Sequence, residues 1–247
     1  MWPLETLIFV FAVFLLGGLV KGVIGLGFPV VVLACLAAPL GLKEAMALLI
    51  VPGVIINIWQ ALAGGAFMPI IRRIRSLLVT SLIGIWAGVQ ILSSADTNFL
   101  IGMLGIVLFA YAALSLARPQ IAPPGEKERW LSPVMGVVGG FVFGLTGSYM
   151  VPGVMYIQSL GLSRDMFVQA LGIIFCLIMA ALGLFMASNK ILPMDIMMIS
   201  AGALVPTTLG MVTGQRLRHR LSERKFRLVL FAALCCAGLY MIVRGFI

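Results

Sequence analysis

The feature that most constrains this chain is the gathering of its apolar residues into long runs separated by short polar stretches. Hydrophobic residues make up 62% of the 247 residues and charged residues only 10%, whereas a soluble domain carries about a quarter charged residues. A helix of about 20 apolar residues crosses the hydrocarbon core of a bilayer. We therefore predict an all-α polytopic membrane protein, and the composition excludes soluble enzymes, disordered regulators and disulfide-rich secreted scaffolds.

Two of the apolar runs differ from the others because they are too long for one span and are interrupted by glycines. Run 4–40 contains the segment KGVIGLGFP, and run 131–162 contains GLTGSYMVPG. We interpret each run as a helical hairpin with short arms, such as residues 6–20 and 28–40. Arms of this length reach only about 20 Å as helices, which favours re-entrant or strongly tilted hairpins. The six ordinary runs cover residues 44–64, 74–93, 98–117, 165–187, 194–214 and 226–246.

The two broken runs correspond to each other in sequence. GGLVKGVIG from Gly17 aligns with GGFVFGLTG from Gly139, and VLFA recurs from Val107 and from Val229 at the same offset. Such ordered matches indicate an internal duplication. We expect a first membrane repeat over residues 1–117, a cytoplasmic linker over 118–130 and a second membrane repeat over 131–247.

The basic residues predict how the two repeats are oriented. If both broken runs return to the side they entered, 13 of the 17 Lys and Arg residues are cytoplasmic, 3 are outside and Lys21 lies within the membrane. If each broken run crosses once, the split is 8 to 8. The positive-inside rule favours the first arrangement. It predicts two inverted-topology repeats, each with a glycine-broken hairpin plus three spanning helices, as in secondary transporters.

The glycine-rich breaks are the candidate sites for chemistry. Non-helical backbone at membrane depth survives only inside protein or beside a wet cavity. Where a second helical arm begins, free N–H groups and the helix dipole favour an anion, and glycine lets a ligand approach the backbone. The alternative is that the pairs Gly18/Gly22 and Gly140/Gly144 are surfaces on which helices pack closely.

Several polar residues are candidates to bind the substrate. Lys21 would supply positive charge, and its alternative role is snorkelling to the membrane interface. Asn57 and Gln60 share a helix face, and their alternative role is hydrogen bonding between helices. The candidate substrate-binding residues are Lys21, Gly22, Gly25, Gly27, Asn57, Gln60, Gly144, Gly147, Ser148 and Tyr149.

Intramembrane catalysis has no visible apparatus in this sequence. No Asp or Glu falls in the middle of an apolar run, and no Ser/His/Asp, HExxH or paired-carboxylate pattern occurs. The four cysteines lie inside apolar runs without a His or acidic partner at ligand spacing. We interpret them as packing residues. We expect no catalytic residue, no metal and no cofactor, and we expect no nucleic acid among the partners.

The segments GGLVKGVIGLGFPVV, GGFVFGLTGSYMVPGVMY and LGMVTGQRLRHRLSERKFRLVL together resemble the TauE/SafE family of sulfite and organosulfonate exporters. The resemblance covers nearly the whole chain. It implies a multi-pass permease of the bacterial inner membrane whose substrate is a small sulfur-containing anion, such as sulfite or sulfoacetate. It also places the family's glycine motifs on Gly22, Gly25 and Gly27 and on Gly144 and Gly147.

The sequence therefore predicts a secondary transporter of a small anion that works by alternating access around a midplane site between the two hairpins. Its partners would be the small anionic substrate and the lipid bilayer. A membrane assembly or regulatory protein without transport activity is the alternative, and an intramembrane enzyme is a third class. Duplication with inverted topology favours transport over the assembly or regulatory role, and the lack of embedded titratable pairs disfavours the enzyme.

Overall fold

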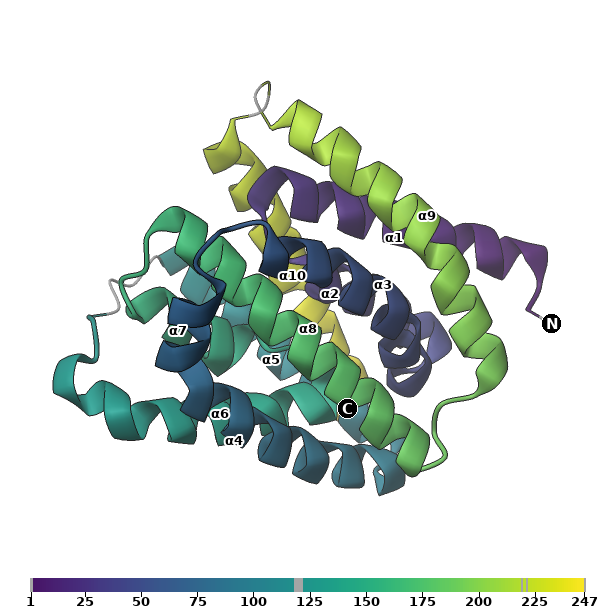
Figure 1. Cartoon of the computed structure of the whole chain (residues 1–247). Coiled ribbons are helices and arrows are strands. Elements are labelled where there is room, and N and C mark those ends of the chain that lie inside the picture. Colours follow the sequence, from purple (N-terminus) through teal and green to yellow (C-terminus); the bar gives the residue numbers. More distant parts are fainter. Residues whose placement is uncertain (1, 118–121, 219, 221, 247) are drawn as a thin grey trace. The chain divides into compact units, whose positions relative to one another are not determined.

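The structure of the protein is a computed structural model that describes every residue except 1, 118–121, 219, 221 and 247 (Figure 1). The described residues form helices and no strand, which confirms the all-α prediction. Eight of the helices, namely α1, α3, α4, α5, α6, α8, α9 and α10, are long and apolar enough to cross a membrane. The elements are α1 (Leu4–Ile24), α2 (Phe28–Leu40), α3 (Leu42–Leu62), α4 (Phe67–Ser94), α5 (Thr97–Ala117), η1 (Gly125–Lys127), α6 (Glu128–Thr146), η2 (Met150–Val154), α7 (Met155–Ser159), α8 (Arg164–Ser188), α9 (Met194–Leu217) and α10 (Glu223–Phe246).

The hairpin arms differ from the sequence prediction in one respect. The first arm of the N-terminal hairpin does not stop at residue 20, because α1 continues to Ile24 and has 21 residues, a length of about 31 Å at 1.5 Å per residue. The second arm, α2, covers residues 28–40 as expected and is short. The expectation of two short arms is thus wrong for the first arm, since Val20 to Ile24 remain helical up to the glycine.

The segment predicted as the linker is partly helical. Residues 118–121 lie outside the described residues, Gly125–Lys127 form the 3₁₀ turn η1, and α6 already begins at Glu128. The mixed charges of this segment therefore belong partly to the first turn of a helix.

The described helices divide into two compact units that each draw on both halves of the sequence. Unit 1 comprises Met1–Pro52, Asp96–Arg118 and Leu192–Ile247, and unit 2 comprises Gly53–Ala95 and Pro119–Ile191. The boundary between the first two segments falls inside α3, between Pro52 and Gly53.

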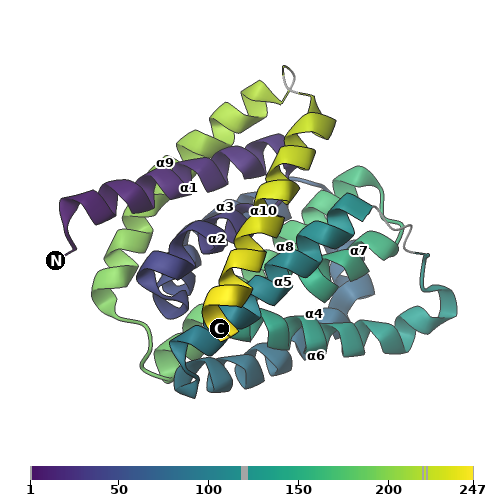
Figure 2. The same cartoon turned by 180° about the vertical axis from the view of Figure 1, so that it is seen from behind.

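In unit 1, α1 packs along α9 and α5 packs along α10 (Figures 1 and 2). Gly18 lies against Thr207 and Gly22 against Met211, so α1 and α9 run in the same direction. The second pair runs in opposite directions, because Gly102 lies against Gly245 whereas the later Gly105 lies against the earlier Gly238. Glycines at these contacts remove side chains from the interface and allow the helix backbones to approach closely.

In unit 2, α4 packs along α6 in the way that α9 packs along α1. Gly140 lies against Ser81 and Gly144 lies against Ile85, so these two helices also run in the same direction. On the α4 side of the same interface, the GxxxG pair Gly84 and Gly88 contacts the α6 backbone. These contacts give the pair a role in helix packing.

A local exchange of hydrogen bonds supports α3 where Pro52 interrupts it. Proline has no N–H group, so the Leu48 carbonyl loses its intrahelical donor. Ser200 of α9 replaces that donor, since its hydroxyl donates to the Leu48 oxygen at 2.7 Å and accepts from the Val51 N–H at 3.2 Å. Ser200 is fully buried, so this contact keeps a polar carbonyl satisfied inside unit 1.

Candidate functional site

The N-terminal hairpin is built by two glycines with left-handed backbone. Gly25 (φ 92°) ends α1, and its N–H donates to the Lys21 carbonyl at 2.7 Å. Gly27 (φ 98°) precedes α2, and its carbonyl accepts from Val31 at 3.1 Å. A residue with a Cβ is strained in this conformation, so glycine is what allows the chain to reverse within three residues. The Gly25 N–H is thus used by the end of α1.

Donors for a ligand in unit 1 are instead expected at the first turn of α2. The N–H groups that open a helix have no intrahelical acceptor, and the helix dipole adds partial positive charge there. The α2 helix has 13 residues and carries Pro29 in this turn, so Phe28 and Val30 provide the N–H groups. Space is open beside the turn, because a Cβ on Gly25 would meet nothing within 4 Å and one on Gly27 only Val20, at 3.5 Å.

Lys21 lies one turn before Gly25, in the last turn of α1. The residue is 9% exposed and counts among the buried polar residues of the protein. An ammonium group is costly to bury unless charge or strong acceptors offset the lost hydration. Its burial disfavours the snorkelling alternative, which requires the side chain to extend to a wet interface.

The C-terminal hairpin begins like the first and then departs from it. Gly147 (φ 74°) ends α6, and its N–H donates to the Phe143 carbonyl at 2.7 Å, as Gly25 does to Lys21. The second arm then consists of two five-residue pieces, η2 and α7, with Val151 in an extended conformation between helical residues. The expectation of a regular helix start in both hairpins is therefore wrong for this one.

Three hydroxyl residues surround the turn at Gly147, and two of them have partners. The Thr146 hydroxyl donates to the Val142 carbonyl at 2.7 Å. The Tyr149 hydroxyl pairs with Ser81 of α4 at 2.9 Å, and the ring packs edge-on against Phe143 and Phe175. These contacts make Tyr149 an anchor for the hairpin. Ser148 is 1% exposed, and within the described chain its Oγ has no hydrogen-bond partner.

Gly22 and Gly144 pack against the backbone of neighbouring helices. A Cβ on Gly22 would overlap the Met211 carbonyl oxygen of α9, and a Cβ on Gly144 would overlap the Ile85 carbonyl oxygen of α4. Both positions are filled by the neighbouring helix backbone. The structure thus favours the packing alternative for these two glycines, while Gly25, Gly27 and Gly147 lie in the turns themselves.

Asn57 and Gln60 lie in unit 2, where they make structural hydrogen bonds. Asn57 donates to the Gly53 carbonyl of its own helix at 2.6 Å. Gln60 donates to the Val168 carbonyl of α8 at 2.7 Å, and Gln169 of α8 returns a bond of the same length to the Ala61 carbonyl. This reciprocal pair joins the end of α3 to the start of α8, which is the interhelical alternative for Gln60.

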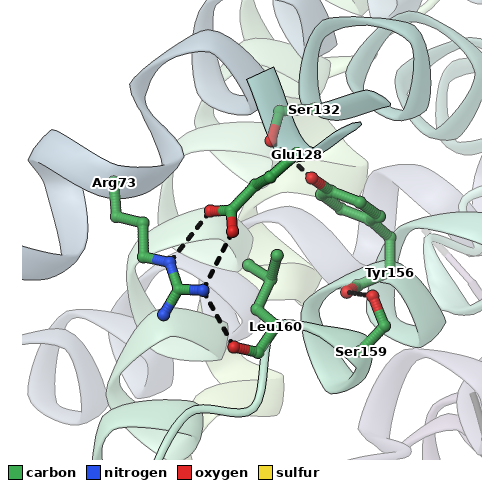
Figure 3. Close-up of polar contacts among 6 residues, drawn as sticks. All are labelled: Arg73, Glu128, Ser132, Tyr156, Ser159 and Leu160. Carbon is green, nitrogen blue, oxygen red and sulfur yellow. Dashed lines mark hydrogen bonds and ion pairs between the residues drawn. The ribbon is translucent and has the colours of Figure 1, made fainter. Parts of the chain in front are cut away.

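A polar cluster that the sequence did not suggest holds the far end of the C-terminal hairpin (Figure 3). Arg73 of α4 forms a two-pronged ion pair with Glu128, with contacts of 2.9 and 3.0 Å, and donates to the Leu160 carbonyl at 2.9 Å. Beside it, the hydroxyls of Ser132 and Tyr156 lie 2.6 Å apart. We call Arg73, Glu128, Ser132, Tyr156 and Leu160 the hairpin latch, because they join α7 and the Leu160 carbonyl that follows it to α6 and α4.

A protein-family model described as Sulfite exporter TauE/SafE matches residues 10–241. The chain belongs to the TauE/SafE family. The match begins in α1 and ends in α10, so it includes both hairpins, and it confirms the resemblance seen in the sequence. No curated protein and no solved structure matches the chain. Membership in the TauE/SafE family implies transport of anions of the sulfite and organosulfonate type across a membrane.

Within this TauE/SafE protein the predicted residues fall into three local groups. Lys21, Gly25 and Gly27 lie together at the first hairpin turn in unit 1. Gly147, Ser148 and Tyr149 lie together at the second turn in unit 2. Gln60 belongs to the contact between α3 and α8, and Asn57 bonds to the Gly53 carbonyl of its own helix. The sequence did not indicate the hairpin latch, because Arg73 and Glu128 are 55 residues apart and each resembles an ordinary charge beside an apolar run.

Proposed function

We propose that this TauE/SafE protein is a secondary transporter of sulfite or an organosulfonate such as sulfoacetate in the bacterial inner membrane. The observation that carries the proposal is the burial of Lys21 at the hairpin turn where α2 begins. A fixed positive charge beside the N-terminus of a 13-residue helix attracts a small oxyanion. We expect charge from Lys21 and backbone donors at Phe28 and Val30 to act on the same anion.

Membrane transport requires that the anion is held without being trapped. Backbone N–H groups are fixed donors that release a ligand without rearranging side chains. A single buried ammonium neutralises one charge, which suits one sulfonate group or the monoanionic form of sulfite. The glycine turn leaves room beside the backbone for the tetrahedral or pyramidal oxyanion group.

The helix pairs of the two units support an inverted-topology repeat. The offset that aligns the two broken runs matches α1 with α6, and the recurring VLFA segment matches α5 with α10. The matched helices α5 and α10 run in opposite directions where they pack together. If the repeats were inserted in the same orientation, a symmetry axis normal to the membrane would relate them. The matched helices α5 and α10 would then run in the same direction. Antiparallel packing therefore favours inverted repeats and, with them, alternating access around a midplane site.

The proposal is tested with purified protein in liposomes. Vesicles carrying the protein are compared with protein-free vesicles for uptake of sulfite, sulfoacetate and acetate under an imposed membrane potential. We expect saturable uptake of sulfite or sulfoacetate that is lost in Lys21→Met. Uptake of none of these anions above the protein-free level would contradict the proposal and favour a membrane assembly or regulatory role.

A further inference from the structure

Ser148 is the one position in the described chain where a buried side-chain nitrogen or oxygen atom has no hydrogen-bond partner. Its backbone N–H is occupied, because it donates to the Thr146 hydroxyl at 3.3 Å. The side-chain hydroxyl is left over. Leaving a buried hydroxyl without a partner is unfavourable, so a ligand that supplies the missing acceptor gains affinity.

Ser148 does not make the hydrogen bond to its own helix that buried serine and threonine hydroxyls usually make. Serine and threonine inside helices donate to a carbonyl one turn earlier. Thr146, Ser81 and Thr207 all do so, with bonds of 2.7 Å to Val142, Leu77 and Ala203. Ser148 follows Gly147, whose left-handed backbone ends α6, so Ser148 is no longer part of a helical turn.

The position that matches Ser148 in the other hairpin is Leu26. Gly25 and Gly147 end the first arms with the same left-handed backbone and the same N–H bond to the carbonyl four residues earlier, so the residues that follow them correspond. Gly27 opens the long helix α2, whereas the matching arm in unit 2 has only short helical pieces.

We infer that the Ser148 hydroxyl donates a hydrogen bond to an oxygen of the transported anion. The C-terminal hairpin of unit 2 has no long helix start like that of α2, and the Ser148 hydroxyl is the donor that it offers. This inference rests on the proposed function and deepens it, since it assigns a contact to the second hairpin from the residues of unit 2 alone. A hydroxyl donor selects ligands that present a hydrogen-bond acceptor, which sulfite and sulfonates do through their oxygens.

The test is the variant Ser148→Ala, measured for thermal unfolding without ligand and for sulfite and sulfoacetate affinity. A ligand contact and a structural contact predict opposite patterns. If Ser148 serves the ligand, the variant unfolds at the same or a higher temperature than wild type, because a buried hydroxyl without a partner has been removed. Its affinity for the anion falls about tenfold or more, the range for a hydrogen bond to a charged group.

Ser132→Ala is the matched control, because Ser132 is an equally buried serine of the same unit whose hydroxyl pairs with Tyr156. We expect it to lower the unfolding temperature and to leave anion affinity unchanged within twofold. Unchanged affinity in Ser148→Ala, or a loss of unfolding temperature like that of Ser132→Ala, would overturn the inference while wild-type binding still supports the proposed function. Absence of anion binding by the wild type would overturn both.

Discussion

Gly18 of α1 lies against the Thr207 carbonyl of α9, and the contact has a counterpart in which Gly140 of α6 lies against the Ser81 carbonyl of α4. The hydroxyls of Thr207 and Ser81 even make the same bond, each to the carbonyl four residues earlier. The α1–α9 pair of unit 1 and the α4–α6 pair of unit 2 therefore make the same kind of glycine contact within their own units.

A methyl group at either of these glycines should destabilise the protein. In Gly18→Ala and Gly140→Ala the new Cβ overlaps a backbone carbonyl, so the helices must separate. We expect each variant to lose about 1–3 kcal/mol of unfolding free energy, the usual cost of overpacking. Thermal unfolding in detergent measures this, with Gly202→Ala as control, since its nearest neighbour is a flexible Phe11 ring atom at 3.5 Å. Equal unfolding temperatures for all three variants would contradict the packing role.

The turn glycines should behave differently from the packing glycines. Gly25→Ala and Gly147→Ala impose a left-handed backbone on alanine, which costs about 1–2 kcal/mol, and they alter the turn at which we expect the anion to bind. We expect both variants to lose anion flux with only modest loss of stability. Gly84→Ala and Gly210→Ala should mainly lower stability, because a Cβ there overlaps the backbone of a neighbouring helix. A parallel loss of flux and stability in all four variants would assign the turn glycines to packing as well.

The hairpin latch should couple Arg73 to Glu128. Their side chains are 40% and 25% exposed, so the ion pair is worth at most about 1 kcal/mol. Arg73→Met should cost more than Glu128→Gln, because it also removes the donor to the Leu160 carbonyl. A double-mutant cycle on thermal unfolding measures the coupling. Strictly additive effects of the two substitutions would show that the pair contributes nothing.

The positive-inside rule makes a prediction about topology. Both termini should face the outside, and residues 118–130 should face the cytoplasm. Single cysteines at Trp2, at Ala122 and after the C-terminus, each in a background without the four native cysteines, report the side by labelling with an impermeant thiol reagent. Labelling of the C-terminal position from the cytoplasm would contradict the inverted repeat.

Sequence patterns predicted the helices and the hairpin turns because these depend on local properties. Runs of apolar residues specify spans, and Gly25 and Gly147 mark the points where helices must end. The roles of individual glycines were harder to separate, since Gly22 and Gly25 differ only in what lies beside them in space. The donor that replaces Pro52's missing N–H comes from Ser200, 148 residues away, and no local pattern indicates it. The sequence likewise does not distinguish the Ser148 hydroxyl, which has no hydrogen-bond partner within the described chain, from those of Thr146 and Tyr149, which have one.

The most direct test of the transporter account is the affinity of Lys21→Met for sulfite and sulfoacetate. Loss of the buried charge should weaken binding by about 1.5–3 kcal/mol, the range for hydrogen bonds to charged groups, with the protein still folded. Lys21→Arg is not expected to restore binding fully, because its planar guanidinium replaces a compact ammonium. Lys225→Met, which removes an exposed charge, is the control and should bind as wild type does. Wild-type affinity in folded Lys21→Met protein would contradict the account, because the charge that defines the proposed site would then contribute nothing to holding the anion.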